Sequence, residues 1–192
     1  MKKLNLSLSI IIALSLLLIS CGNRQEAPGA SIEKISNPDK TFSIEDFEAL
    51  GLKKNKTYKV ADLPKATSAY YGFLKVKGTK ITVDYELRFY DSQVEALNPG
   101  VEWVEERIGK GAVLTKGDAR WKEGVKEART CGGDSGHGKG YSLVVASSTC
   151  NLAKYFDYFI YGNTILLCQG KDIESATANC RLLLSKLETV PE

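Results

Sequence analysis

Histidine is the scarcest of the chemically versatile residues in this chain, and its scarcity limits the sites that the chain can build. The sequence has 192 residues and one histidine, His137. A zinc site needs several Cys and His ligands at set spacings, and no C-x-x-C pair or second histidine supplies them. The sequence therefore predicts neither a metal ion nor a cofactor, and it contains no assembled catalytic constellation.

A large excess of positive charge is also missing. Lys and Arg number 26 against 23 Asp and Glu, which gives a formal net charge of +3. Two of the positive charges, Lys2 and Lys3, lie at the N-terminus and not in the body of the chain. Proteins that bind nucleic acid carry a basic patch that neutralises phosphates. The sequence therefore predicts no nucleic-acid partner.

The first twenty residues have the pattern of a signal peptide. A positive start is followed at residues 4–19 by the uncharged run LNLSLSIIIALSLLLI, which is the order of charge and apolar residues that export signals use. The alternative is an uncut membrane anchor, but sixteen residues fall short of the roughly 20 that a spanning helix needs. The run ends in LISC, and this stretch resembles the lipobox of bacterial lipoproteins.

The lipobox resemblance implies a lipid anchor on Cys21. In such lipoproteins the thiol of the cysteine carries diacylglycerol, the chain is cut just before it, and the new amine is acylated, with palmitate among the expected chains. Two or more acyl chains hold a protein to a membrane far more firmly than one. The resemblance therefore predicts a protein on the extracytoplasmic face of a bacterial membrane. Gly22, in place of an inner-membrane retention signal, favours the outer membrane in a diderm host.

The mature chain divides into a tether and one domain. Residues 21–40 carry the lipid and are rich in Gly, Pro, Ser and charge, a composition typical of flexible linkers. Residues 41–192 suit a single globular domain with one core. Hairpins and helices follow one another without strict βαβ alternation. This order predicts an α+β fold, with an antiparallel sheet and two or three packing helices.

Particular segments carry these signals. Strands are expected at residues 69–77, 81–90, 141–145, 155–161 and 164–169, and helices at 44–50, at 94–108 with a division at Pro99-Gly100, and after Asp172. The strand at 81–90 alternates apolar and polar residues, which predicts one buried and one wet face. The segment 118–129 fits no single element. The final helix carries an apolar stripe of Ile173, Ala176, Cys180, Leu183, Leu184 and Leu187.

Four cysteines remain after Cys21, and an even number in an exported chain indicates disulfides. Cys180 lies on the apolar stripe of the last helix, and Cys168 ends the strand that leads into it. This placement predicts the pairs Cys168–Cys180 and Cys131–Cys150.

The stretch CGGDSGHGKG at residues 131–140 contains two catalytic resemblances. GDSG resembles the tetrapeptide around the nucleophile of trypsin-like proteases, but the only histidine lies two residues after Ser135 and cannot replace a distant base. GDSGHGK resembles part of a phosphate loop, yet a glycine follows Lys139 where that loop needs a hydroxyl. Five glycines in ten residues predict an exposed loop. Its candidate binding residues are Asp134, Ser135, His137 and Lys139.

Other chemically interesting groups are expected to be structural. The aromatic residues of segments 70–73 and 155–161, Trp103 and Trp121 are expected in the core rather than on a stacking platform. The carboxylates of Glu102, Glu105 and Glu106 are expected on a solvated helix face. A metal site at Asp134 and His137 lacks identifiable further ligands.

These observations lead to two hypotheses about function. The first is a non-enzymatic lipoprotein that binds, senses or assists at the cell envelope, with an envelope protein or a small ligand as partner. The alternative is an envelope hydrolase centred on residues 131–140, using Ser135 with His137 or Asp134.

Overall fold

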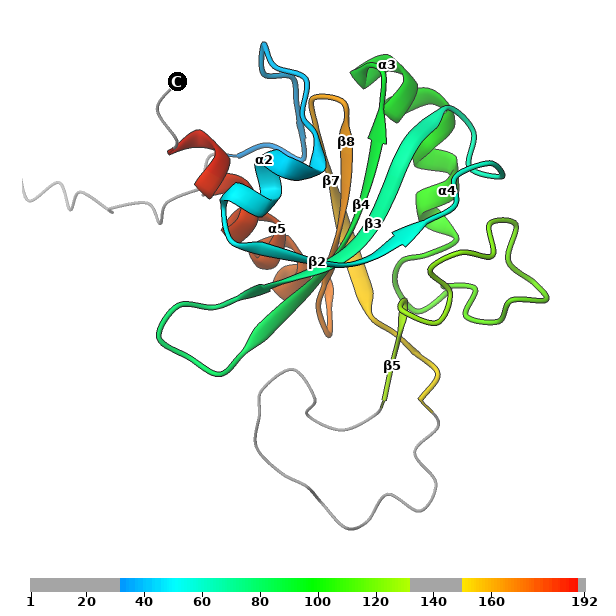
Figure 1. The fold of residues 1–192 in the computed structure, drawn as a ribbon. Coiled ribbons are helices and arrows are strands. Elements are labelled where there is room, and N and C mark those ends of the chain that lie inside the picture. The colour runs from blue at the N-terminus through cyan, green and yellow to red at the C-terminus, as the bar shows by residue number, and fades with distance from the viewer. Residues whose placement is uncertain (1–31, 132–149, 190–192) are drawn as a thin grey trace, which may run out of the picture.

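The structure, a computed structural model, describes residues 32–131 and 150–189 (Figure 1). It has a six-stranded sheet with helices on both faces. The elements are β1 Ile35–Ser36, α2 Ile44–Ala49, β2 Leu52–Tyr58, β3 Ala66–Lys75, β4 Thr82–Tyr90, α3 Gln93–Glu95, the π-helix η2 Ala96–Gly100, α4 Val101–Glu105, β5 Arg129–Thr130, β6 Leu152–Ala153, β7 Tyr155–Tyr161, β8 Thr164–Gln169 and α5 Ile173–Glu188. The predicted α+β fold is confirmed. The predicted strand at 141–145 lies outside the described residues.

Two hairpins form the centre of the sheet. The strand order is β1-β7-β8-β4-β3-β2, and β5 and β6 form a separate two-stranded ladder. The pairs β2–β3, β3–β4, β4–β8 and β7–β8 are antiparallel, whereas β1 joins β7 in parallel. The sheet is therefore mixed only at its β1 edge, and β4 lies at its centre.

Asn163, in the turn between β7 and β8, links the sheet to the chain segment before α2. Asn163 is 5% exposed. Its side-chain oxygen accepts a hydrogen bond from Phe42 N at 2.7 Å, and its amide donates to the carbonyls of Phe42 and Tyr90 at 3.0 and 2.9 Å. Because one side chain satisfies three backbone groups, this turn does more than reverse the chain.

One face of the sheet packs against α2 and α5 (Figure 1). Helix α2 begins with a capping box, in which the Asp46 carboxylate accepts a hydrogen bond from Ser43 N at 2.8 Å. Helix α5 begins at Asp172, whose carboxylate accepts from Ser175 N at 2.8 Å. Most of the predicted apolar stripe is buried, but Ile173 is 66% exposed because it lies in the first turn, at the end of the helix.

The other face of the sheet is also covered, so the prediction of a wet face on β4 is wrong. The short helices α3, η2 and α4 lie over it (Figure 1), followed by a segment of turns and bends at residues 106–128. We call residues 93–128 the covering layer. Trp121 from that segment is 1% exposed. Glu86 and Arg88, the polar residues that were expected to face water, are completely buried beneath this layer.

Part of the segment that was assigned to the tether is packed against the sheet. Ile32 is 3% exposed, and β1 pairs with β7 through Ile35–Ile160 and Ser36–Tyr161. Residues 32–40, which were assigned to the tether, therefore include a buried side chain and a strand of the main sheet. Within residues 32–131 and 150–189, no helix is both long enough and apolar enough to cross a membrane.

Candidate functional site

Both predicted disulfides are present. Cys168 joins Cys180, and so links β8 to α5, while Cys131 joins Cys150 next to the β5–β6 ladder. The candidate binding residues Asp134, Ser135, His137 and Lys139, and the predicted lipid-bearing Cys21, lie outside the described residues. Cys131 and Cys150 are the described residues on either side of the segment 132–149, so the described surface next to this disulfide is the place to look for a binding site.

A surface pocket of about 280 Å³ lies at this base. We call it the loop-base pocket. It lies where the beginning of β4, the end of β8 and the β5–β6 ladder meet, and Cys131 forms part of its wall. Its polar lining residues are Thr82, Asp84, Arg129, Thr130, Lys154 and Gln169.

Backbone hydrogen bonds fix the position of Lys154 between the ladder and the main sheet. Its N–H donates to the carbonyl of Ala128 at 2.8 Å, and its carbonyl accepts from the N–H of Gly170 at 3.1 Å. The ladder pairs Arg129 with Ala153 and Thr130 with Leu152. The two cationic residues of the loop-base pocket, Arg129 and Lys154, are therefore held by regular pairing and not by a free chain end.

The carboxylate of the loop-base pocket is already neutralised. Lys154 Nζ lies 2.6 Å from Asp84 Oδ2, and the two side chains are 12% and 18% exposed. The Tyr71 hydroxyl donates to the same oxygen at 2.8 Å, and Lys154 Nζ lies 4.9 Å from the Tyr71 ring centroid. Burial, together with the nearby Asp84 charge, raises the pKa of Tyr71. The hydroxyl therefore stays protonated at neutral pH and continues to donate.

Arg129 is the remaining charge of the loop-base pocket. It is partly buried, and its guanidinium makes no hydrogen bond or ion pair with any residue in 32–131 or 150–189. Since Asp84 and Lys154 cancel, the lining carries one net positive charge. An arginine fork in a pocket is a ready donor for a carboxylate or phosphate.

A second pocket, of about 240 Å³, lies towards the far end of β4 and has the opposite sign. It is lined by residues that include Phe89, Tyr90 and the start of α2. Its charged lining residues are Glu45 and Asp91, both acidic. The two pockets thus differ in the class of ligand that each would attract.

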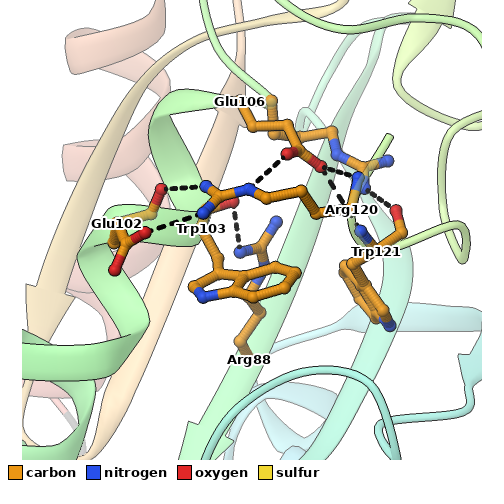
Figure 2. A network of polar contacts seen from close by, with 7 residues as sticks. Arg88, Glu102, Trp103, Glu106, Arg120 and Trp121 are labelled. Carbon is orange, nitrogen blue, oxygen red and sulfur yellow. Dashed lines mark hydrogen bonds and ion pairs between the residues drawn. The ribbon is translucent and has the colours of Figure 1, made fainter. Parts of the chain in front are cut away.

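Further along β4 from the loop-base pocket, the strand carries a buried ion pair. Arg88 Nε donates to Glu86 Oε1 at 2.8 Å, its Nη2 lies 2.7 Å from the same oxygen, and its Nη1 donates to the Trp103 carbonyl at 3.0 Å. The guanidinium also lies 4.9 Å from the centroid of the Trp121 ring. Figure 2 shows the bond from the Arg88 guanidinium to the Trp103 backbone. Because both charged groups are sealed from water, this pair determines how the covering layer packs and cannot reach a ligand.

A second arginine holds the covering layer from outside. Arg120 bonds the Glu106 carboxylate through Nε at 2.8 Å and the Glu102 carboxylate through Nη1 at 2.7 Å, and its guanidinium lies 4.4 Å from the Trp103 ring centroid (Figure 2). Glu102 is exposed as expected, but the Glu106 side chain is only 9% exposed, since this clamp covers it. The paired carboxylates of α4 are therefore joined by a cation, and they link the helix to the irregular segment.

Buried tyrosines complete the interior next to the ion pair. Burial raises the pKa of Tyr155 and of Tyr58, and the Glu86 charge raises both further. The two hydroxyls have no hydrogen-bond partner among the described residues. The hydroxyls of Tyr155 and Tyr58 therefore stay protonated across the physiological pH range.

Sequence reasoning missed every charged residue of the loop-base pocket. Asp84, Arg129 and Lys154 lie on three segments that are distant in the chain, and no motif joins them. One signal was available: Arg129 and Thr130 immediately precede Cys131, so the predicted disulfide already placed them at the base of the loop. In residues 32–131 and 150–189 there is no group of three His, Cys, Asp or Glu residues arranged to hold a metal ion.

Comparison with known proteins gives a family but no function. No curated protein and no solved structure shows significant similarity to the chain. The family of unknown function DUF6810 matches residues 43–189, which include both packed faces of the sheet, both disulfides and the loop-base pocket. The chain therefore belongs to the DUF6810 family.

Proposed function

We propose that this protein is a membrane-anchored, extracytoplasmic bacterial lipoprotein that acts as a non-enzymatic binding module of the cell envelope. The observation that carries the binding role is the loop-base pocket, in which the half-buried Arg129 has no partner among residues 32–131 and 150–189 and lies beside a neutralised Asp84–Lys154 pair. Ligand sites combine a concave surface with a few fixed polar groups, and the loop-base pocket has both.

Export and anchoring rest on two independent features. The lipobox resemblance ends in Cys21, where the lipid would be attached. The other four cysteines form two disulfides, and such bonds persist in oxidising compartments outside the cytoplasm. Both features favour the same side of the membrane, although they lie in different parts of the chain.

Binding is favoured over hydrolysis by the state of the carboxylates near the loop. Asp84 is held by Lys154 and Tyr71, and Glu86 is sealed with Arg88. A general base needs a carboxylate or imidazole that is free to take a proton from a nucleophile. In the described part of the pocket the available group is instead a cation, which suits recognition of a charged ligand.

Anchoring is tested by replacing Cys21 and fractionating the cells. The Cys21→Ala variant should leave the membrane fraction or accumulate as an uncleaved precursor, because the acylated thiol is gone. A matched control is Ser20→Ala, which keeps a small residue before the cysteine and should be processed normally. A Cys21→Ala protein that is processed and retained like the control would contradict the proposal.

The hydrolase alternative has its own test. A serine-reactive activity probe applied to the full-length protein should give no labelling that depends on Ser135. Labelling that disappears in Ser135→Ala but persists in Ser147→Ala, a second serine of the same disulfide-closed segment, would establish an enzyme in place of a binding module.

A further inference from the structure

We infer that the loop-base pocket binds a small oxyanion, a carboxylate or a phosphate group, through Arg129. This inference rests on the proposed binding function and names the class of ligand. The geometry points to an anion because, among the described lining residues, several hydrogen-bond donors and one positive charge have no partner, whereas the one carboxylate is already bound.

Arg129 is the main contact of the site. The ladder pairing of Arg129 with Ala153, next to the Cys131–Cys150 disulfide, fixes its backbone. Its guanidinium is partly buried and has no described partner. A guanidinium presents parallel N–H donors that match both oxygens of a carboxylate or phosphate, and charge-assisted bonds of this kind are about twice as strong as neutral ones.

Further donors of the pocket have no acceptor within the described chain. The side-chain oxygen of Gln169 accepts from Asp84 N at 2.7 Å, and this bond orients the amide so that its Nε2 remains available. The hydroxyls of Thr82 and Thr130 likewise make no hydrogen bond with any residue in 32–131 or 150–189. An oxyanion would satisfy these groups together with Arg129, whereas a cation would meet only one, already paired carboxylate.

The Asp84–Lys154 ion pair does not prevent an anion from binding at Arg129, because the Asp84 charge is already neutralised. With Nζ 2.6 Å from Oδ2, and a second bond from the Tyr71 hydroxyl, the negative charge of Asp84 is offset and repels an anion at Arg129 less than a free carboxylate would. The acidic pocket at the far end of β4 has no such cation. Binding is therefore expected at one end of β4 only. The volume of about 280 Å³ limits the ligand to a small molecule or to the charged end of a larger one.

The test is calorimetric titration of the full-length lipidated protein, extracted in a non-ionic detergent. The probes are succinate, inorganic phosphate and the uncharged succinamide. Succinate or phosphate should bind saturably at one site per chain, and succinamide at least about tenfold more weakly. The two charged probes distinguish a carboxylate from a phosphate source. Since an ionic hydrogen bond accounts for about 10- to 100-fold in affinity, Arg129→Gln should weaken the better probe by that factor.

The control variant also removes one positive charge, but from a residue that lies outside the loop-base pocket. Lys122 is exposed, and Lys122→Gln should bind the better probe within about twofold of the unaltered protein. Near-ultraviolet circular dichroism identifies any variant that has lost its fold. Arg129→Lys keeps the charge but not the guanidinium fork, so its affinity for the better probe should lie between those of Arg129→Gln and Lys122→Gln.

Three results would overturn the inference: no saturable binding of either anion, equal affinity for succinamide, or equal affinities of the Arg129→Gln and Lys122→Gln variants. These results leave the Cys21→Ala fractionation untouched. Failure of the ligand class is thereby distinguished from failure of the proposed lipoprotein function.

Discussion

The buried pair on β4 gives the sharpest test of how the covering layer is held. Both side chains, Glu86 and Arg88, are 0% exposed, and two guanidinium nitrogens lie 2.7 and 2.8 Å from one carboxylate oxygen. The variant Glu86→Gln keeps the shape and one acceptor but removes the negative charge. Arg88 then stays buried with neutral acceptors alone, the amide oxygen of the variant side chain and the Trp103 carbonyl at 3.0 Å.

The magnitude follows from the burial of the pair. Two unit charges about 4 Å apart attract by about 4 kcal/mol at an effective dielectric constant of about 20. Removing one partner of a buried pair costs about 3–5 kcal/mol in measured cases. A domain of this size has a total free energy of unfolding of only about 5–15 kcal/mol. Glu86→Gln is therefore expected to remove a large share of the stability.

The assay is urea unfolding followed by tryptophan fluorescence, because Trp121 contacts Arg88 and reports on this layer. The matched control is Glu105→Gln on the exposed surface of α4, which should change the free energy of unfolding by less than about 0.5 kcal/mol. The double variant Glu86→Leu with Arg88→Met removes both charges and should recover most of the loss. A cost below about 1 kcal/mol for Glu86→Gln would refute the reasoning.

Three further predictions use the same unfolding assay. Tyr155→Phe removes a buried hydroxyl without a described partner, so stability at pH 7 should be unchanged or higher by up to about 1 kcal/mol; above pH 10 it should also fall less steeply. Gly100→Ala should cost about 1–3 kcal/mol, because a Cβ there would lie 2.7 Å from Ile165 Cδ1, whereas Gly111→Ala meets open space and should be neutral. Asn163→Ala should cost about 2–4 kcal/mol, since three buried backbone groups lose their partner.

The alkaline prediction depends on a definite sign. Burial raises the pKa of Tyr155 above its usual value of 10.0 in the folded protein. The folded state therefore holds this proton more tightly than the unfolded state does. Its contribution is fully present below about pH 10 and is lost as the pH rises through the raised folded pKa, by up to about 1.4 kcal/mol per pH unit. An identical decline above pH 10 in Tyr155→Phe would contradict this assignment.

The other two predictions fail on equally specific results. Gly100→Ala and Gly111→Ala with equal stabilities would show that η2 can move away from the sheet. Asn163→Ala with unchanged stability would show that the turn and the chain before α2 are held by other contacts. Both outcomes can be interpreted because each variant changes one side chain whose contacts the structure describes.

Both disulfides and the strands β3, β4, β7 and β8 were predictable because their signals are local. The edge strand β2 was missed, because its polar, exposed sequence LKKNKTY shows no alternation of apolar residues. The alternation of residues 81–90 gave β4, and the position of Cys180 on the stripe of α5 gave its partner Cys168. The wet face of β4 was predicted wrongly, because periodicity shows that two faces differ but not what covers each one. The cover contains the irregular residues 106–128, which have no period to detect.

The candidate site was harder to predict than the fold. Its cation Arg129 and its neutralised pair, Asp84 and Lys154, come together only when β4, β8 and the β5–β6 ladder are assembled. Single residues on strand ends carry no motif, so their meeting depends on the register of the sheet. The sequence did indicate the region, through Cys131 and the glycine-rich stretch that follows it.

The most direct test of the central proposal is mass spectrometry of the mature N-terminal peptide from the membrane-extracted protein. We predict a chain that begins at Cys21, with a diacylglyceryl group on its sulfur and an acyl group on its amine. A mature chain that begins at another residue, or an unmodified Cys21 in a membrane-held protein, would contradict the account.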